Sequence, residues 1–178
     1  MSTKPSLNLL ELQDVFGKIL SGEDFGEPTN DIAELIYLGQ FSQRNLEDLL
    51  MEHNINDIRK IRIHLLDLVL CYITYSLEDN FLTAREAENV RYLKRIFKIQ
   101  EGDFYQKKYS EIETILDRQF LLMYQNNKID GIEALQKVQL QELFDLSNDQ
   151  FLRLRNKFVS GSLDKGAEAL DMETFMKF

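Results

Sequence analysis

The sequence predicts an all-α protein, a compact helical bundle that contains an internal repeat of one helix pair. Two observations predict this fold class. Apolar residues recur at helical spacing along most of the 178-residue chain, and no run alternates strictly between apolar and polar residues as a half-buried strand would. The segment 80–104 also recurs at 127–151, which indicates that one helical unit is used twice.

The repeat is carried mainly by positions that we expect in the core. Identical residues stand at Asn80 and Asn127, Glu86 and Glu133, Ala87 and Ala134, Leu93 and Leu140, Phe97 and Phe144, and Phe104 and Phe151. Other matched positions, such as Ile96 and Leu143, stay apolar in both copies. Because an amphipathic helix must bury its apolar stripe against another element, we expect the two copies to pack about a pseudo-twofold axis around one interior.

The first part of the chain, residues 1–56, does not show the spacing of the repeat. Apolar residues at helical intervals predict helices over residues 9–20, 28–38 and 42–51. Gly39 stands near the expected end of the second helix, where glycine is common. We interpret this part as an N-terminal helical extension of the same domain.

Residues 57–160 hold the repeat and are the expected core. Thr83 and Glu86 have the spacing of a capping box, in which a hydroxyl and a carboxylate satisfy backbone amides at the start of a helix. Ser147 and Gln150 have the same spacing in the second copy. The periodicity predicts helices in this core over residues 57–77, 83–97, 103–124, 132–144 and 148–158.

The end of the chain is expected to leave this core. Ser160, Gly161 and Ser162 form the strongest break in the helical pattern. Residues 161–178 are therefore predicted to be a C-terminal tail, with a short helix over residues 171–177.

Composition excludes several classes of partner. The formal net charge of −9 argues against nucleic acid, which requires clustered lysine and arginine. Cys71 is the single cysteine, so neither an internal disulfide nor a cysteine metal site can form. The most apolar stretch, residues 63–77, contains His64 and Asp67 and is too short to span a bilayer. Since the N-terminus also lacks the pattern of a signal peptide, we expect a cytoplasmic protein without direct membrane insertion.

Catalytic patterns are not evident in the sequence. His53 and His64 are the only two histidines, and neither a HExxH motif, a phosphate-binding glycine loop nor a GxSxG elbow occurs. His64 and Asp67 are close enough on one helix to interact, which is typical of a satisfied hydrogen bond in a core. We therefore predict that the protein is not an enzyme. A hydrolase-type helical enzyme with a cavity between the two copies is the alternative.

The connection before the first repeated helix has a recognisable pattern. Residues 79–86 read DNFLTARE, which resembles the Asp-Gly-x-Leu-x-x-x-Glu signature of the tellurite-resistance B (TerB-like) family. The apolar helix before this connection and the segment 93–104 after it also resemble the family, so the resemblance covers about residues 60–160. Asn80 stands where the family has glycine, and the second copy has Asn126 and Asn127 without the aspartate.

The TerB-like resemblance implies a compact all-helical cytosolic domain. The family is linked to chemical-stress responses, proposed metal sensing and assembly with partner proteins near membranes. Carried over to this sequence, Asp79 and Glu86 would be the acidic pair that contacts a divalent cation. Local structure offers a competing explanation of both residues, because Glu86 fits a capping box and Asp79 fits a turn.

A calcium-binding EF-hand is the other interpretation of this connection. If Glu86 occupies the twelfth position of such a loop, the first and third positions fall on Tyr75 and Leu77. Calcium needs six or more oxygen ligands, and these side chains do not supply them in the required places. The spacing therefore excludes an EF-hand.

The most consistent functional hypothesis is a non-catalytic helical interaction module in a chemical-stress or metal-stress response. It implies a protein partner, requires no cofactor and leaves a homo-oligomer open. The alternative is a metal-responsive binding protein that uses Asp79 and Glu86 in an acidic loop between helices. Calorimetry with divalent metal ions separates the two hypotheses.

Overall fold

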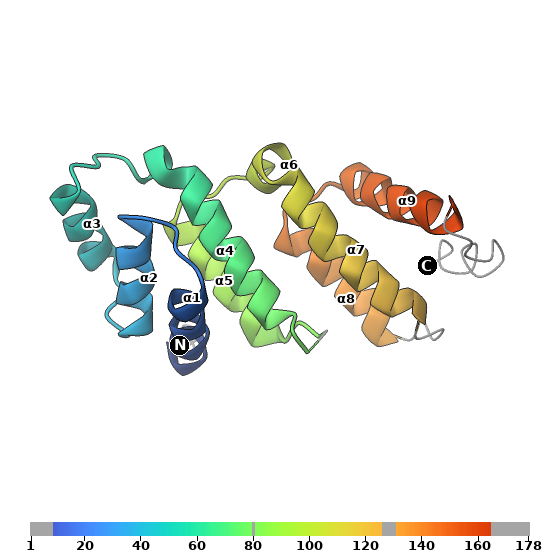
Figure 1. Ribbon diagram of the computed structural model, residues 1–178, viewed down its shortest axis with the longest axis horizontal. Helices are drawn as coiled ribbons and strands as arrows, with labels where there is room; N and C mark the ends of the chain where they lie inside the picture. Colours follow the sequence, from blue (N-terminus) through green and yellow to red (C-terminus); the bar gives the residue numbers. More distant parts are fainter. Residues whose placement is uncertain (1–8, 80, 126–130, 165–178) are drawn as a thin grey trace, which may run out of the picture. The chain divides into compact units, whose positions relative to one another are not determined.

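A computed structural model describes residues 9–79, 81–125 and 131–164 of the chain. Every regular element in these residues is a helix, as Figure 1 shows, which confirms the predicted all-α class. The chain divides into two compact units, one formed by residues 1–79 and 83–100 and the other by residues 80–82 and 101–178. The N-terminal helices share a unit with the helices that follow them up to residue 100, and the boundary expected at residue 56 stays a prediction.

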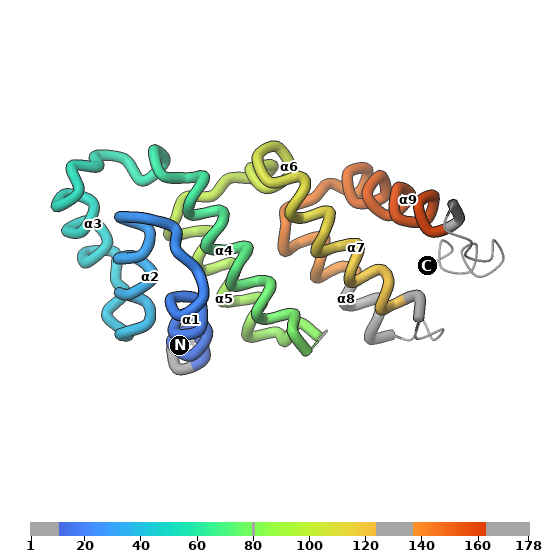
Figure 2. Tube along the Cα trace, viewed as in Figure 1, coloured from blue at the N-terminus to red at the C-terminus, as the bar shows by residue number. Residues whose placement is uncertain are grey.

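The first unit is built around one helix that is mostly apolar. Its elements are α1 (Leu9–Gly22), α2 (Thr29–Tyr37), α3 (Gln43–Glu52), the 3₁₀ turn η1 (Ile58–Ile61), α4 (Arg62–Ser76) and α5 (Ala84–Ile96). Helix α4 contacts α1, α2 and α5, and α1 lies beside α2 (Figure 2). Most apolar side chains of α4 are buried, and apolar helix surface is stable when other elements cover it, which explains why α4 is the centre of this unit.

Aromatic side chains join α4 to its neighbours. The fully buried ring of Tyr72 on α4 stacks on Phe16 of α1, with 5.9 Å between ring centroids. The Tyr72 hydroxyl accepts a 2.9 Å hydrogen bond from Nδ2 of Asn89 on α5. Burial raises the pKa of Tyr72 to about 12, and the hydrogen bond satisfies its polar end within the core.

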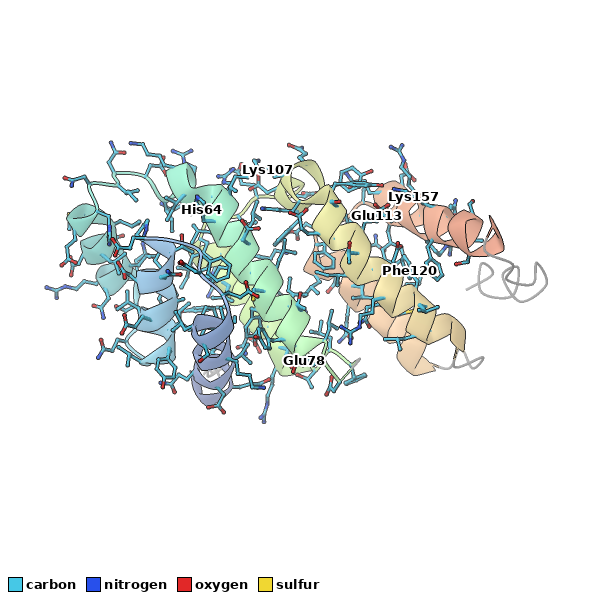
Figure 3. The ribbon with its side chains drawn as sticks, in the orientation of Figure 1. His64, Glu78, Lys107, Glu113, Phe120 and Lys157 are labelled. Atoms are coloured by element: carbon cyan, nitrogen blue, oxygen red, sulfur yellow. The ribbon has the colours of Figure 1, made fainter. Side chains whose placement is uncertain are left out.

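The second unit contains four helices in its described part. They are α6 (Asp103–Lys107), α7 (Tyr109–Gln125), α8 (Gly131–Leu143) and α9 (Asn148–Asp164). Phe120 of α7 packs against α9, with ring centroids 5.5 Å from Phe151 and 5.6 Å from Phe158. An ion pair between Glu113 and Lys157 also joins these two helices, and Figure 3 labels both residues.

Two expectations for this unit are wrong. The predicted helix over 103–124 is interrupted at Lys108, whose backbone leaves the helical region at φ −134° and ψ 33°. The Lys108 side chain is buried, and its Nζ lies 3.6 Å from a Glu111 carboxylate oxygen. No glycine or proline stands at this position to indicate the interruption. The break expected at Ser160–Ser162 is absent, because α9 continues to Asp164. A glycine inside a helix costs only about 1 kcal/mol, which the contacts of α9 with α7 can offset.

Helices α5 and α8 correspond to the two copies of the predicted repeat. Phe97 and Phe144 follow their last residues and are both fully buried. The next residues, Lys98 and Asp145, have left-handed backbone angles with φ of 53° and 51°. Each helix closes with the amide-to-carbonyl bonds typical of a Schellman motif, Ile99 to Lys94 at 2.9 Å and Leu146 to Gln141 at 3.0 Å.

The remainder of the two repeated segments is less alike. The helix after α5 is α6, with 5 residues, whereas the helix after α8 is α9, with 17 residues. Since α5 and α8 also belong to different units, packing of the two copies about a pseudo-twofold axis stays a prediction. The predicted helix over residues 171–177 lies outside the described residues.

Candidate functional site

Glu86 occupies the helix cap that its spacing predicts. The Thr83 amide donates to Oε2 of Glu86 at 2.7 Å, and the Glu86 amide donates to Oγ1 of Thr83 at 3.2 Å. The predicted capping box at the start of α5 is therefore confirmed. Asp79 is exposed in the connection after α4. Metal binding by Asp79 and Glu86 stays a prediction, and one carboxylate oxygen of this pair already accepts a hydrogen bond from a backbone amide.

Replacing Glu86 with alanine is expected to lower the free energy of unfolding by about 0.5–1 kcal/mol, because the Thr83 amide loses its acceptor. Urea denaturation followed by circular dichroism measures this change. Glu78→Ala is the matched control, since it removes a nearby exposed carboxylate that lies outside the cap. Equal effects of the two substitutions would show that charge, and not the cap, is responsible.

The thiol and imidazole side chains of the sequence belong to Cys71, His53 and His64. Burial raises the pKa of the Cys71 thiol to about 11, so little thiolate exists at neutral pH. His64 is exposed on α4 (Figure 3), and its predicted interaction with Asp67 stays a prediction. The structure instead places His53 against Asp31, with 2.7 Å between Nε2 of the histidine and Oδ2 of the aspartate.

The first unit contains an open groove with a volume of about 860 Å³. It lies between α3, the segment that leads into η1, and the chain that leaves α5. Its apolar lining consists of Leu46, Leu50, Met51, Ile55, Ile58, Ile96 and Ile99. Met51 is 66% exposed, which places a flexible apolar side chain at the solvent side of the groove. We call this surface the α3–α5 groove.

Two helix ends of the same type shape the α3–α5 groove. Helix α3 begins at its cap Ser42 and is followed by Asn54 in the left-handed region, with φ 57°. The Ile55 amide then bonds to the Leu50 carbonyl at 2.7 Å, as Ile99 does at the end of α5. A Schellman end brings an apolar residue back against its own helix. Both isoleucines thereby become part of the groove lining.

Charged side chains lie at one side of the α3–α5 groove. The Arg59 guanidinium donates to the Asp57 carboxylate, with 2.8 Å from Nε to Oδ2. These hydrogen bonds, together with one from the Arg59 amide and the charge of Lys98, hold the pKa of Asp57 well below its usual range. The charged residues of the lining are therefore two cations, Arg59 and Lys98, and two anions, Glu47 and Asp57.

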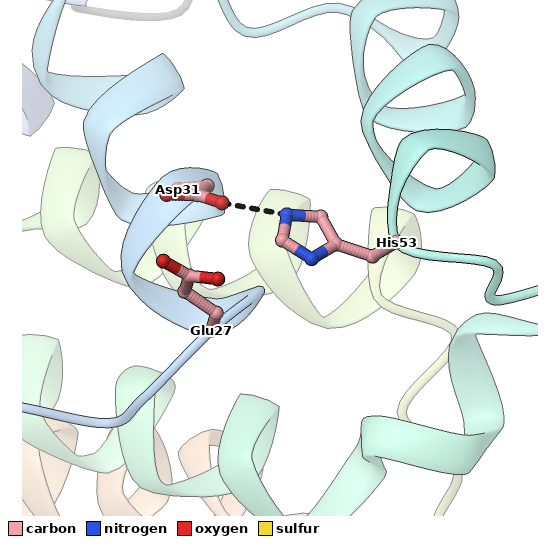
Figure 4. A group of neighbouring side chains, drawn as sticks. All are labelled: Glu27, Asp31 and His53. Atoms are coloured by element: carbon pink, nitrogen blue, oxygen red, sulfur yellow. Dashed lines mark hydrogen bonds and ion pairs between the residues drawn. The ribbon is translucent and has the colours of Figure 1, made fainter.

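A second cluster in the same unit combines Glu27, Asp31 and His53 (Figure 4). Glu27 precedes α2, Asp31 lies in the first turn of α2, and His53 follows α3. One potential ligand atom from each residue lies within 4.8 Å of the other two. Among the described residues, no other group of three or more His, Cys, Asp or Glu side chains has its potential ligand atoms this close together.

This cluster is not evident from the sequence. Glu27 and Asp31 have a helical spacing that could have indicated a shared face. His53, however, is 22 residues away from Asp31 in the chain. Only the packing of α2 against α3 brings the three side chains together.

Comparisons with known proteins do not assign the chain to a family. No helix in the described ranges has both the length and the apolar character needed to cross a bilayer, as expected. No protein-family model, curated protein or solved structure matches the chain. The TerB-like resemblance and the roles that it implies therefore stay predictions.

Proposed function

We propose that this protein is a non-catalytic interaction module whose α3–α5 groove binds an amphipathic helix of a partner protein. The groove is the observation that carries the proposal. A chemical-stress or metal-stress setting is part of the proposal and is supported by the TerB-like resemblance alone.

The lining of the groove suits the apolar face of a helix. Leu46 and Leu50 are one turn apart on α3, and Ile96 and Ile99 face them from the end of α5. Helix-in-groove recognition uses apolar side chains of a groove to bury anchors at positions i, i+3, i+4 and i+7 of the partner. Met51 is suited to the rim, because its unbranched side chain adapts to different apolar neighbours.

The charges at the groove define the chemistry of the partner. Asp57 pairs with Arg59, and Glu47 and Lys98 are the other two charged residues of the lining, so its formal charges balance. The whole chain has a formal net charge of −9, so most of its surface disfavours an acidic peptide. Complementary charge at a rim orients a partner and raises its association rate. We therefore expect an amphipathic helix with a carboxylate at the end that lies near Lys98.

The groove lining also supports a binding role over a catalytic one. Among the described residues that line it, there is no histidine, cysteine, serine or tyrosine that could act as a nucleophile or a general base at neutral pH. The one strongly perturbed carboxylate, Asp57, has a lowered pKa and is held by Arg59.

A photo-crosslinking amino acid at position 51 tests the occupant directly. The full-length chain with this probe is expressed in its native cell, irradiated, and the attached peptide is identified by mass spectrometry. We expect a contiguous segment with apolar residues at helical spacing and an acidic residue beside them. The matched control carries the probe at Leu38, which is 49% exposed and does not line the groove. Equal products from the two positions, or a segment without helical spacing, would contradict the proposal.

A synthetic copy of the captured segment then measures the contribution of the groove. Met51→Glu is expected to weaken its binding about tenfold or more, because a charge would be buried against apolar side chains. Leu38→Glu is expected to leave the affinity unchanged. Lys98→Glu is expected to slow association and to reduce its dependence on salt. Fluorescence anisotropy and stopped-flow kinetics provide these values, and unaltered binding by Met51→Glu would place the segment elsewhere.

A further inference from the structure

We propose that Glu27, Asp31 and His53 form a binding site for one divalent transition-metal ion, with zinc as the best match. This inference does not depend on the α3–α5 groove. It also concerns other residues than Asp79 and Glu86, the pair for which the sequence suggested a cation.

The three side chains are close to the geometry that zinc requires. Zinc bonds to nitrogen and oxygen are about 2.0–2.2 Å long, so neighbouring ligand atoms in a tetrahedral site are about 3.4 Å apart. Nε2 of His53 and Oδ2 of Asp31 are 2.7 Å apart, and all three ligand atoms lie within 4.8 Å of one another. Glu27 is exposed, so a small side-chain rotation can bring its carboxylate to the ion.

The backbone around these residues is well defined by hydrogen bonds. Oδ1 of Asp24 accepts from the Gly26 amide at 2.9 Å and from Nδ2 of Asn30 at 2.7 Å. These bonds hold the loop that carries Glu27 against the start of α2. On the other side, the His53 amide bonds to the Leu49 carbonyl at 3.1 Å and caps α3. The ligands therefore come from two fixed helix ends, which lowers the entropic cost of assembling a site.

The donor set selects the class of metal. One imidazole nitrogen and two carboxylate oxygens match the three protein ligands of an open zinc site, in which water takes the fourth position. Calcium and magnesium prefer more oxygen ligands and disfavour imidazole. Two carboxylates beside one imidazole also leave at least one negative charge that a dication would neutralise. Without a metal, the same contact is a hydrogen bond between His53 and Asp31, and it is an ion pair only when the imidazole is protonated.

Zinc titration of the untagged, chelator-treated full chain separates a zinc site from a metal-free contact between His53 and Asp31. Isothermal calorimetry is expected to show one zinc ion per chain, and cobalt should produce the visible absorption of a four-coordinate site. His53→Ala and Glu27→Gln are each expected to reduce zinc affinity about tenfold or more. Because Glu27 is exposed, the glutamine variant removes a ligand without disturbing the core. Circular dichroism confirms that both variants are folded.

Three control variants define specificity. His64→Ala removes the other histidine of the chain, Glu34→Gln removes an exposed carboxylate of α2, and Asp79→Asn removes the acidic residue suggested by the sequence. All three are expected to bind zinc as the unmodified chain does. No zinc binding by the unmodified chain would leave only the ion pair and overturn the proposal. Binding that survives His53→Ala or Glu27→Gln, or that is lost in Asp79→Asn, would overturn it as well.

Discussion

Replacing Phe97 with alanine is expected to lower the free energy of unfolding by about 3–5 kcal/mol. Phe97 directly follows α5 and has no solvent exposure. Its ring meets Phe41 edge-to-face, with 5.9 Å between centroids. Truncation removes this contact as well as the buried apolar surface, and it leaves a cavity that the Schellman turn after α5 cannot close without losing its hydrogen bonds.

Urea denaturation of the full chain, followed by circular dichroism, measures the effect of Phe97→Ala. The matched control is Leu38→Ala in the same unit, where a half-exposed side chain should cost about 1 kcal/mol or less. If Phe97→Ala cost no more than the control, the core face that we assign to α5 would be wrong. A large loss confined to Phe97 would support it.

Local patterns allowed much of the fold to be predicted. The apolar spacing of α5 predicts that Leu93 and Phe97 face the core, and both are fully buried. The capping box of Thr83 and Glu86 was predictable for the same reason, because both hydrogen bonds form within one turn of the chain. These features depend on neighbours in sequence, and so a sequence contains the information needed to infer them.

Features that depend on tertiary contacts were not predictable. The interruption at Lys108 follows no glycine or proline and accompanies burial of the lysine side chain. The helical conformation of Gly161 runs against its intrinsic preference, and a Cβ added there would meet no atom within 4 Å. In both places the backbone conformation differs from what the local residue types indicate.

The candidate sites show the same contrast. The α3–α5 groove is formed by segments that are far apart in sequence and meet only through folding, although each Schellman end is local. The cluster of Glu27, Asp31 and His53 likewise requires α2 to lie against α3. The sequence of the connection after α4 instead suggested Asp79 and Glu86 as the pair that contacts a divalent cation. A carboxylate that caps a helix and one that binds a metal can have the same sequence spacing, so spacing alone could not separate these roles.

Replacing Phe144 with alanine is expected to cost about 3–5 kcal/mol, similar to the cost of Phe97→Ala. Phe144 follows α8 as Phe97 follows α5, is equally buried, and precedes a residue with the same left-handed backbone. Its ring meets Phe104 edge-to-face at 5.9 Å between centroids. If the two copies of the repeat contribute similarly to the free energy of unfolding, alanine at either matched position should remove similar packing.

The comparison of these two substitutions tests the repeat more directly than either one alone. Val138→Ala on α8 is the control for the second unit, because Val138 is 51% exposed and should contribute little to stability. Costs that agree within about 1 kcal/mol for Phe97 and Phe144 would indicate that both copies use this position as an anchor of their cores. A small cost at Phe144 beside a large one at Phe97 would show that the second copy keeps the sequence and the helix ending while its stability depends on other contacts, such as those of Phe120 with α9.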